Sequence, residues 1–158
     1  MKSRNNFSPV LALLAALGFG FLACNDCSDT IDAPVTTPIR FSIVSPDGEN
    51  LVDKNQSRYS ADSITLFDTQ EKEWIYLVKE YVPAAKGYVF LGDCAKNKNG
   101  QSSLILQLNS FDSDTLDVSY KQIDNKCFLL YEYTSFQHNG RDLQQSPITS
   151  ALLIIKAE

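Results

Sequence analysis

Beyond residue 38 the chain consists of short apolar-alternating runs, and the alternation is cleanest in the middle of the chain. In the run 102–109, Leu104, Leu106 and Leu108 share one parity, and in the run 115–122 an apolar residue likewise recurs at every second position. Such alternation places one face of a β-strand on a core and the other in water. No stretch keeps the apolar period of an amphipathic helix over several turns. An all-β fold is therefore expected.

Turn-forming residues separate these runs. They include Pro46-Asp47-Gly48, Lys98-Asn99-Gly100 and Asn139-Gly140. The strands expected between the turns are 39–45, 63–68, 73–81, 88–94, 102–109, 115–122, 127–136 and 149–157. In a chain of 158 residues, about eight such strands predict a single antiparallel β-sandwich, immunoglobulin-like or related. A closed lipocalin-like barrel fits the strand number equally well, but Trp74 lacks the preceding glycine of the Gly-x-Trp signature that usually begins one.

The N-terminal segment has the organisation of a secretory signal. Lys2 and Arg4 precede an unbroken apolar run from Val10 to Leu22, and no acidic residue occurs before Asp26. The run is too short to cross a hydrocarbon core, which needs roughly 20 apolar residues as a helix. We therefore expect residues 1–23 to be a signal peptide that is not part of the folded domain.

The end of this run, Phe21-Leu22-Ala23-Cys24, resembles the lipobox of bacterial lipoproteins, in which a small residue precedes a cysteine that becomes diacylated. It differs from the usual pattern at Phe21, where leucine is commoner, and at Leu22, where a smaller residue is commoner. Simple secretion is the alternative, but signal peptidase favours a small residue at the position that Phe21 occupies. The resemblance implies that Cys24 is lipidated and anchors the protein in a membrane.

The residues after Cys24 indicate where an anchored protein would reside. Asn25 stands where aspartate retains many Gram-negative lipoproteins in the inner membrane, and the acidic residues that follow resemble a patch that directs some lipoproteins to the cell surface. Residues 24–38, rich in Asp, Thr and Pro, are expected to form an extended tether, and residues 39–158 the sandwich domain. The whole chain resembles small lipoproteins of Gram-negative envelopes that carry one uncharacterised all-β domain.

Composition and motifs favour a non-catalytic protein. The net charge is −5, and no Lys/Arg-rich run could neutralise a phosphate backbone, so no nucleic-acid partner is expected. The only histidine, His138, precedes Asn139-Gly140 and is expected to be a solvent-exposed turn residue. Asp112, Asp114 and Asp117 lack the spacing of a helix-loop-helix calcium loop, so solvated turn acids are expected, with calcium as the alternative. No catalytic residue, metal site or cofactor is predicted.

Three cysteines remain after Cys24. In an exported chain, Cys94 and Cys127 each have the parity of inward-facing neighbours, which predicts a disulfide between them. Cys27, in the tether, would be free, paired between chains or capped. The alternative is that all three are unpaired thiols.

Trp74 and Tyr76 share one parity of the expected strand 73–81, and Ile75 and Leu77 share the other. If the aromatic pair points outward, it forms a platform that stacks on sugar rings or anchors a protein partner. If it points inward, it belongs to the core. Trp74 and Tyr76 are therefore the candidate binding residues.

Together these features predict a lipid-anchored protein of the outer membrane whose β-sandwich binds or scaffolds without catalysis. The expected partners are the membrane, through the lipid anchor, and a glycan or protein ligand. The alternative is a barrel that carries a small ligand or inhibits an envelope or host hydrolase. An enzyme ranks third.

Overall fold

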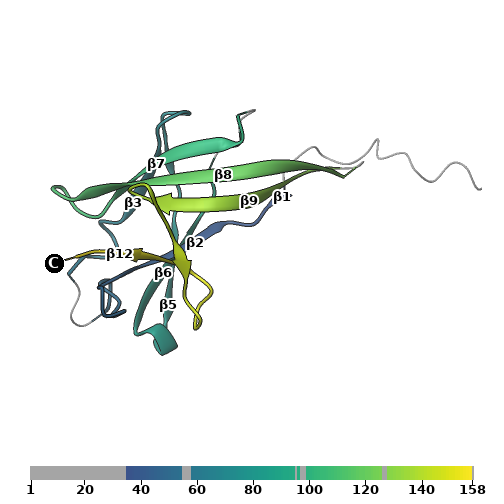
Figure 1. Ribbon diagram of the computed structural model, residues 1–158. Helices are drawn as coiled ribbons and strands as arrows, with labels where there is room; N and C mark the ends of the chain where they lie inside the picture. Colours follow the sequence, from purple (N-terminus) through teal and green to yellow (C-terminus); the bar gives the residue numbers. More distant parts are fainter. Residues whose placement is uncertain (1–34, 55–57, 95, 97–98, 126–127, 158) are drawn as a thin grey trace, which may run out of the picture.

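The computed structural model describes residues 35–54, 58–94, 96, 99–125 and 128–157, which form two β-sheets in two layers (Figure 1). The predicted all-β sandwich is confirmed, since the described strands form two separate sheets and do not close into a barrel. Among these described residues, no helix is long and apolar enough to cross a membrane.

The larger sheet has seven strands in the order β1-β9-β8-β7-β3-β4, with β10 also paired to β9. Its strands are β1 (Val35–Thr36), β3 (Thr65–Asp68), β4 (Glu73–Ile75), β7 (Gln101–Gln107), β8 (Ser113–Asn125), β9 (Phe128–His138) and β10 (Arg141–Asp142). All its pairings are antiparallel except that of β1 with β9. Val35 and Thr36, which we expected in the tether, thus join the sheet.

The smaller sheet has five strands in the order β11-β12-β2-β6-β5. Its strands are β2 (Ile39–Val44), β5 (Val78–Val82), β6 (Gly87–Gly92), β11 (Gln144–Gln145) and β12 (Leu152–Ile155). A single 3-10 turn, η2 (Pro83–Ala85), connects β5 to β6. The last strand, β12, pairs in parallel with β2, the first strand of this sheet along the chain.

The core lies between the two sheets and contains the residues that the alternation placed inward. From the larger sheet it receives Leu66, Leu104, Leu106, Leu116, Val118 and Tyr120, and from the smaller sheet Ile39, Phe41, Ile43, Phe90 and Ile154. Phe41 and Phe90 stack with ring centroids 5.4 Å apart. Burial of these side chains is the main force that holds the two layers together.

The run 73–81 is not one regular strand, and this prediction was wrong. Residues Glu73–Ile75 form β4 in the larger sheet, and Val78–Val82 form β5 in the smaller sheet. Tyr76 and Leu77 carry the chain from one layer to the other, and Leu77 is buried in the core. A straight strand with apolar residues at both parities would leave one apolar face in water. The crossing instead buries Leu77 and gives each sheet an edge strand.

The β8–β9 hairpin extends beyond the rest of the larger sheet (Figure 1). Strand β7 pairs only with the first part of β8, from Ser113 to Ser119. The register shifts at Ser119/Tyr120, which marks a β-bulge. Beyond this bulge, the distal half of the hairpin pairs within itself and with β1.

Candidate functional site

Trp74 and Tyr76 both lie at the surface, so the outward alternative of the sequence analysis is the one observed. Trp74 is 62% exposed and Tyr76 is 84% exposed, whereas Leu77 is buried. Trp74 lies in the edge strand β4, and Tyr76 directly follows it. It is unusual for two large aromatic side chains only two residues apart to be exposed, because such groups normally bury most of their surface area.

Trp74 is the end of an apolar row across three strands on the outer face of the larger sheet. Trp74 pairs in register with Phe67 of β3, and Phe67 pairs with Ile105 of β7. The rings of Trp74 and Phe67 meet edge to face with centroids 5.0 Å apart. Ile105 is 40% exposed. We call Trp74, Phe67 and Ile105 the apolar row.

A row of polar side chains lies on the same face, and it extends from β7 in the direction away from Trp74. Ser103 of β7 pairs in register with Asp117 of β8, Asp117 with Gln137 of β9, and Gln137 with Asp142 of β10. Ser103 Oγ donates a hydrogen bond to Asp117 Oδ1 at 2.7 Å, and Gln137 Nε2 donates to Asp142 Oδ1 at 2.9 Å. We call Ser103, Asp117, Gln137 and Asp142 the polar row.

Three members of the polar row, Ser103, Asp117 and Gln137, line a shallow groove. The groove has a volume of about 280 Å³ and is also lined by Gln70, Gln101 and Ser119. Ser103 and Ile105 are two residues apart on β7, so the two rows approach to roughly 7 Å there. Trp74 lies two strands to the side of β7, or roughly 10 Å from it. A ligand several sugar rings long, with apolar ring faces and hydrogen-bonding edges, matches this arrangement.

One residue of the apolar row, Ile105, could have been recognised from the sequence alone. Ile105 occupies an outward position in the run 102–109, where its neighbours of the same parity, Ser103 and Gln107, are polar. An apolar residue at an outward position indicates contact with another group. Phe67 carried no comparable signal, because its face depends on how β3 pairs with β4 and β7.

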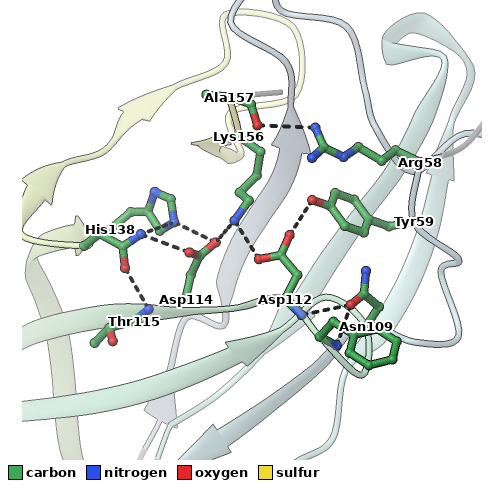
Figure 2. Close-up of polar contacts among 11 residues, drawn as sticks. Arg58, Tyr59, Asn109, Asp112, Asp114, Thr115, His138, Lys156 and Ala157 are labelled. Atoms are coloured by element: carbon green, nitrogen blue, oxygen red, sulfur yellow. Dashed lines mark hydrogen bonds and ion pairs between the residues drawn. The ribbon is translucent and has the colours of Figure 1, made fainter.

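A second polar cluster connects the two sheets at the C-terminal end of the chain (Figure 2). Lys156 Nζ lies 2.9 Å from Asp112 Oδ1 and 2.8 Å from Asp114 Oδ2. The Tyr59 hydroxyl donates to Asp112 Oδ2 at 2.7 Å, and His138 Nε2 lies 3.1 Å from Asp114 Oδ2. We call this the Lys156 cluster. Since each of these carboxylates already has protein partners, the cluster acts as a structural link between the layers.

Two expectations about this cluster were wrong. The His138 side chain is only 11% exposed, because Asp114 holds it beneath the turn that follows β9. Asp112 and Asp114 are ion-paired rather than solvated. Both carboxylates form ion pairs with Lys156. The local sequence around Lys156 did not predict this contact. Within the described part of the chain, no group of three His, Cys, Asp or Glu residues is placed to hold a metal ion.

The contacts of the Lys156 cluster shift the pKa values of its members. Hydrogen bonds from Tyr59 and Lys156 lower the pKa of Asp112. Burial alone would raise the pKa of Asp114, but the hydrogen bonds it accepts, chiefly from Lys156, hold its pKa below the usual value. Burial would lower the pKa of Lys156, but the two carboxylates outweigh burial and raise it. The charged forms of all three groups are therefore favoured in the folded protein.

Cys94 is buried, has polar neighbours and forms no disulfide with another described residue. Its Sγ lies 3.6 Å from the Tyr133 hydroxyl and 3.4 Å from Lys96 Nζ. Burial raises the pKa of Tyr133, and the nearby Cys94 and Asp93 raise it further. Cys127 lies outside the described residues, so the Cys94–Cys127 disulfide stays a prediction. Cys24 and Cys27 also lie outside them.

Comparison with known proteins assigns no relative to this chain: no protein family, curated protein or solved structure matches it.

Proposed function

We propose that this protein is a lipid-anchored envelope protein whose β-sandwich binds a glycan without catalysis, on the outer face of the larger sheet. The exposed Trp74 ring, packed against Phe67 on the same face as the polar row, carries this proposal. One sugar ring of an oligosaccharide would stack its C–H face on Trp74. The hydroxyl groups of further sugar units along the same chain would bond to Asp117 and Gln137, which lie three and four strands away, or roughly 14 and 19 Å.

The composition of the face favours a glycan over a protein ligand. A stable protein interface buries about 800 Å² on each partner around an apolar centre. Here the apolar row contains only three side chains and continues into a row of hydroxyl, carboxylate and amide groups. An oligosaccharide, in contrast, can stack one sugar ring on an aromatic side chain and bond to polar groups further along the same face.

The proposed anchor is supported by the sequence before the sandwich. The apolar run Val10–Leu22 ends at Ala23-Cys24, and the described sheet begins at Val35. A short tether would therefore connect a lipidated Cys24 to the sandwich. Anchored in the outer membrane, on its periplasmic or surface side, the sandwich would present the aromatic face to envelope or environmental glycans.

The Trp74→Ala variant tests the binding face. The full chain is screened on a glycan array, and the dissociation constant of the best ligand is measured by calorimetry. We expect Trp74→Ala to weaken binding at least tenfold, which corresponds to about 1.4 kcal/mol. The melting temperature should hardly change, because most of the Trp74 side chain is in water. Tyr76→Ala and Asp117→Asn should each weaken binding to a smaller extent.

Phe111→Ala is the matched control. Phe111 is an aromatic residue that is 98% exposed and lies between β7 and β8, outside the apolar row. Its removal should leave binding unchanged. Equal affinity of Trp74→Ala and the unaltered chain for the array ligand would refute the proposed face.

A further inference from the structure

A cleft of about 560 Å³ lies beneath the distal half of the β8–β9 hairpin. Ile39, Leu91 and Leu152 line it from the smaller sheet, and Leu130, Tyr131 and Phe136 line it from the hairpin. This volume is within the range of small-ligand sites, roughly 300–1,000 Å³. The cleft is on the opposite side of the larger sheet from the apolar row, because Phe136 pairs with the inward-facing Val118.

The hairpin wall of the cleft is built from packed aromatic rings. The rings of Tyr133 and Phe136 have centroids 5.0 Å apart, and Tyr120 meets Tyr131 edge to face at 5.8 Å. Within the described residues, the pairing of β8 with β7 ends at Ser119. This part of the hairpin therefore places its apolar inner side over a space that core side chains do not fill.

Charged groups occur at the cleft as surface ion pairs. Arg40 Nη2 lies 3.3 Å from Glu80, and Glu132 lies 2.9 Å from Lys121. Both acidic partners are about half exposed, so these pairs add little stability and can be exchanged for other partners. Among the described residues, the buried Nε of Arg40 has no hydrogen-bond partner. A ligand carboxylate that replaces the half-exposed Glu80 would pair with Nη2 of Arg40.

The position of the cleft relative to the chain start points to the source of its ligand. Thr37 and Pro38, which directly follow β1, line the cleft. Cys24 lies eleven residues before Val35, a stretch that spans at most about 40 Å when fully extended. If Cys24 carries the anchor, the cleft is at the end of the sandwich that is tied to the membrane.

We propose that this cleft binds a free fatty acid taken from the membrane. The acyl chain would lie among Leu91, Tyr131 and Phe136, and the carboxylate would pair with Arg40. The volume suits one hydrocarbon chain rather than the several chains of a phospholipid or a lipoprotein anchor. The inference rests on the proposed lipid anchor for the source of the lipid, but not on the glycan-binding face.

Photocrosslinking in membranes tests this site. The full chain is reconstituted into phosphatidylcholine vesicles that contain a trace of palmitate bearing a diazirine, and the labelled peptides are mapped after irradiation. We expect labelling within residues 130–136 and 37–40. Thr37→Trp, which fills the mouth of the cleft from an exposed position, should reduce this labelling at least fivefold. Ser110→Trp, also at an exposed position but outside the cleft, should leave it unchanged.

Two further variants separate the ligand from its alternatives. Unlabelled palmitate should compete with the probe better than hexadecanol does, and Arg40→Gln should abolish this preference. In the Cys24→Ser chain, probe delivered from albumin should still label residues 130–136. If that labelling is seen and Cys24 of the unaltered chain carries no lipid, the proposed lipid anchor is rejected and the proposed fatty-acid site stands. Equal labelling of Thr37→Trp and Ser110→Trp, or loss of labelling in Cys24→Ser, would overturn the proposed site.

Discussion

Lys156 follows the last strand of the smaller sheet and places its ammonium between Asp112 and Asp114, on the side of the larger sheet. The Lys156 and Asp114 side chains are 15% and 7% exposed. Their mutual attraction is therefore screened less than that of a surface pair. Removal of the lysine would leave two neighbouring carboxylates without a counter-charge, which is more costly than the loss of the contact itself.

The Lys156→Met variant should lower the free energy of unfolding by about 2–4 kcal/mol near neutral pH. Asp112 and Asp114 have pKa values below their ordinary 3.8, so their contribution is present above pH 3.8 and is lost as the pH falls through the lowered values. Lys156 has a pKa above 10.5, so its contribution is lost only as the pH rises through that raised value. The difference in the free energy of unfolding between Lys156→Met and the unaltered chain should therefore be constant between pH 3.8 and pH 10.5 and should shrink below pH 3.8. Urea unfolding at a series of pH values measures it.

Lys121→Met is the control for this prediction. Lys121 also forms a close ion pair, with Glu132 at 2.9 Å, but both side chains are more than half exposed. The Lys121→Met substitution should change the free energy of unfolding by less than about 0.5 kcal/mol. Equal losses in the two lysine variants would contradict the role given to the Lys156 cluster.

Parity groups side chains by face but does not decide which face is exposed. The shared parity of Trp74 and Tyr76 followed from their spacing and left both orientations open, and the structure shows both residues exposed and Leu77 buried. His138 was not predictable, because its burial depends on Asp114, a residue of a different strand. Side chains whose surroundings come from distant segments cannot be placed from local sequence.

At the scale of elements, the passage from β4 to β5 depends on close packing at one glycine. A Cβ atom at Gly92 would lie 2.7 Å from Leu77 Cδ2 and 3.1 Å from Ile75 Cγ2. Gly92 ends β6, and Leu77 is the residue that enters the core where the chain changes sheets. The passage of the chain from β4 to β5 thus needs the space that Gly92 leaves by having no side chain.

Gly92→Ala should therefore reduce the free energy of unfolding by about 1–3 kcal/mol, because the added methyl group overpacks this contact. Leu77→Ala alone should cost about 2–5 kcal/mol through the cavity it leaves. The double variant should be less destabilised than the two losses combined, since the shortened Leu77 side chain makes room for the methyl group. Denaturant unfolding of the four proteins measures the coupling, and strict additivity would show that Gly92 and Leu77 do not share this space.

The predicted strands outside 73–81 correspond to observed strands, with shifted ends. Asn139-Gly140, predicted as a tight turn, has positive φ values of 49° and 75° at its two residues, as a hairpin turn of this kind requires. The strands β1, β10 and β11 were not predicted. Each has only two residues, and a periodic pattern cannot be recognised over so short a length.

At the scale of the whole molecule, the proposed anchor determines where the sandwich acts. Metabolic labelling with a palmitate analogue should modify the unaltered chain, and the mature protein should begin at Cys24. Cys24→Ala should remove the label, whereas the control Cys27→Ala should retain it. Label that persists in Cys24→Ala, or a mature N-terminus elsewhere, would disprove the anchor.

The two-layer architecture was predictable from alternation and turn spacing, but the strand order was not. Alternation shows that a strand has one buried face, and it carries no information about which strand lies beside it. The parallel pairings of β1 with β9 and of β12 with β2 join segments that are remote in the chain. The outer-face site depends on that order, because the apolar row and the polar row each combine residues from several strands.

The parallel pairing of β12 with β2 also has a consequence for the order of folding. Phe41 and Leu152, partners in this pairing, come from opposite ends of the described chain. Until β12 is in place, β2 has an unpaired edge in the smaller sheet, so this layer is completed only after residues 152–155 have been synthesised. Such non-local closure makes folding slow compared with the growth of individual hairpins. If residues 1–23 act as the proposed signal peptide, the smaller sheet is still incomplete when that signal is recognised, and an incompletely folded chain is what a translocation channel requires.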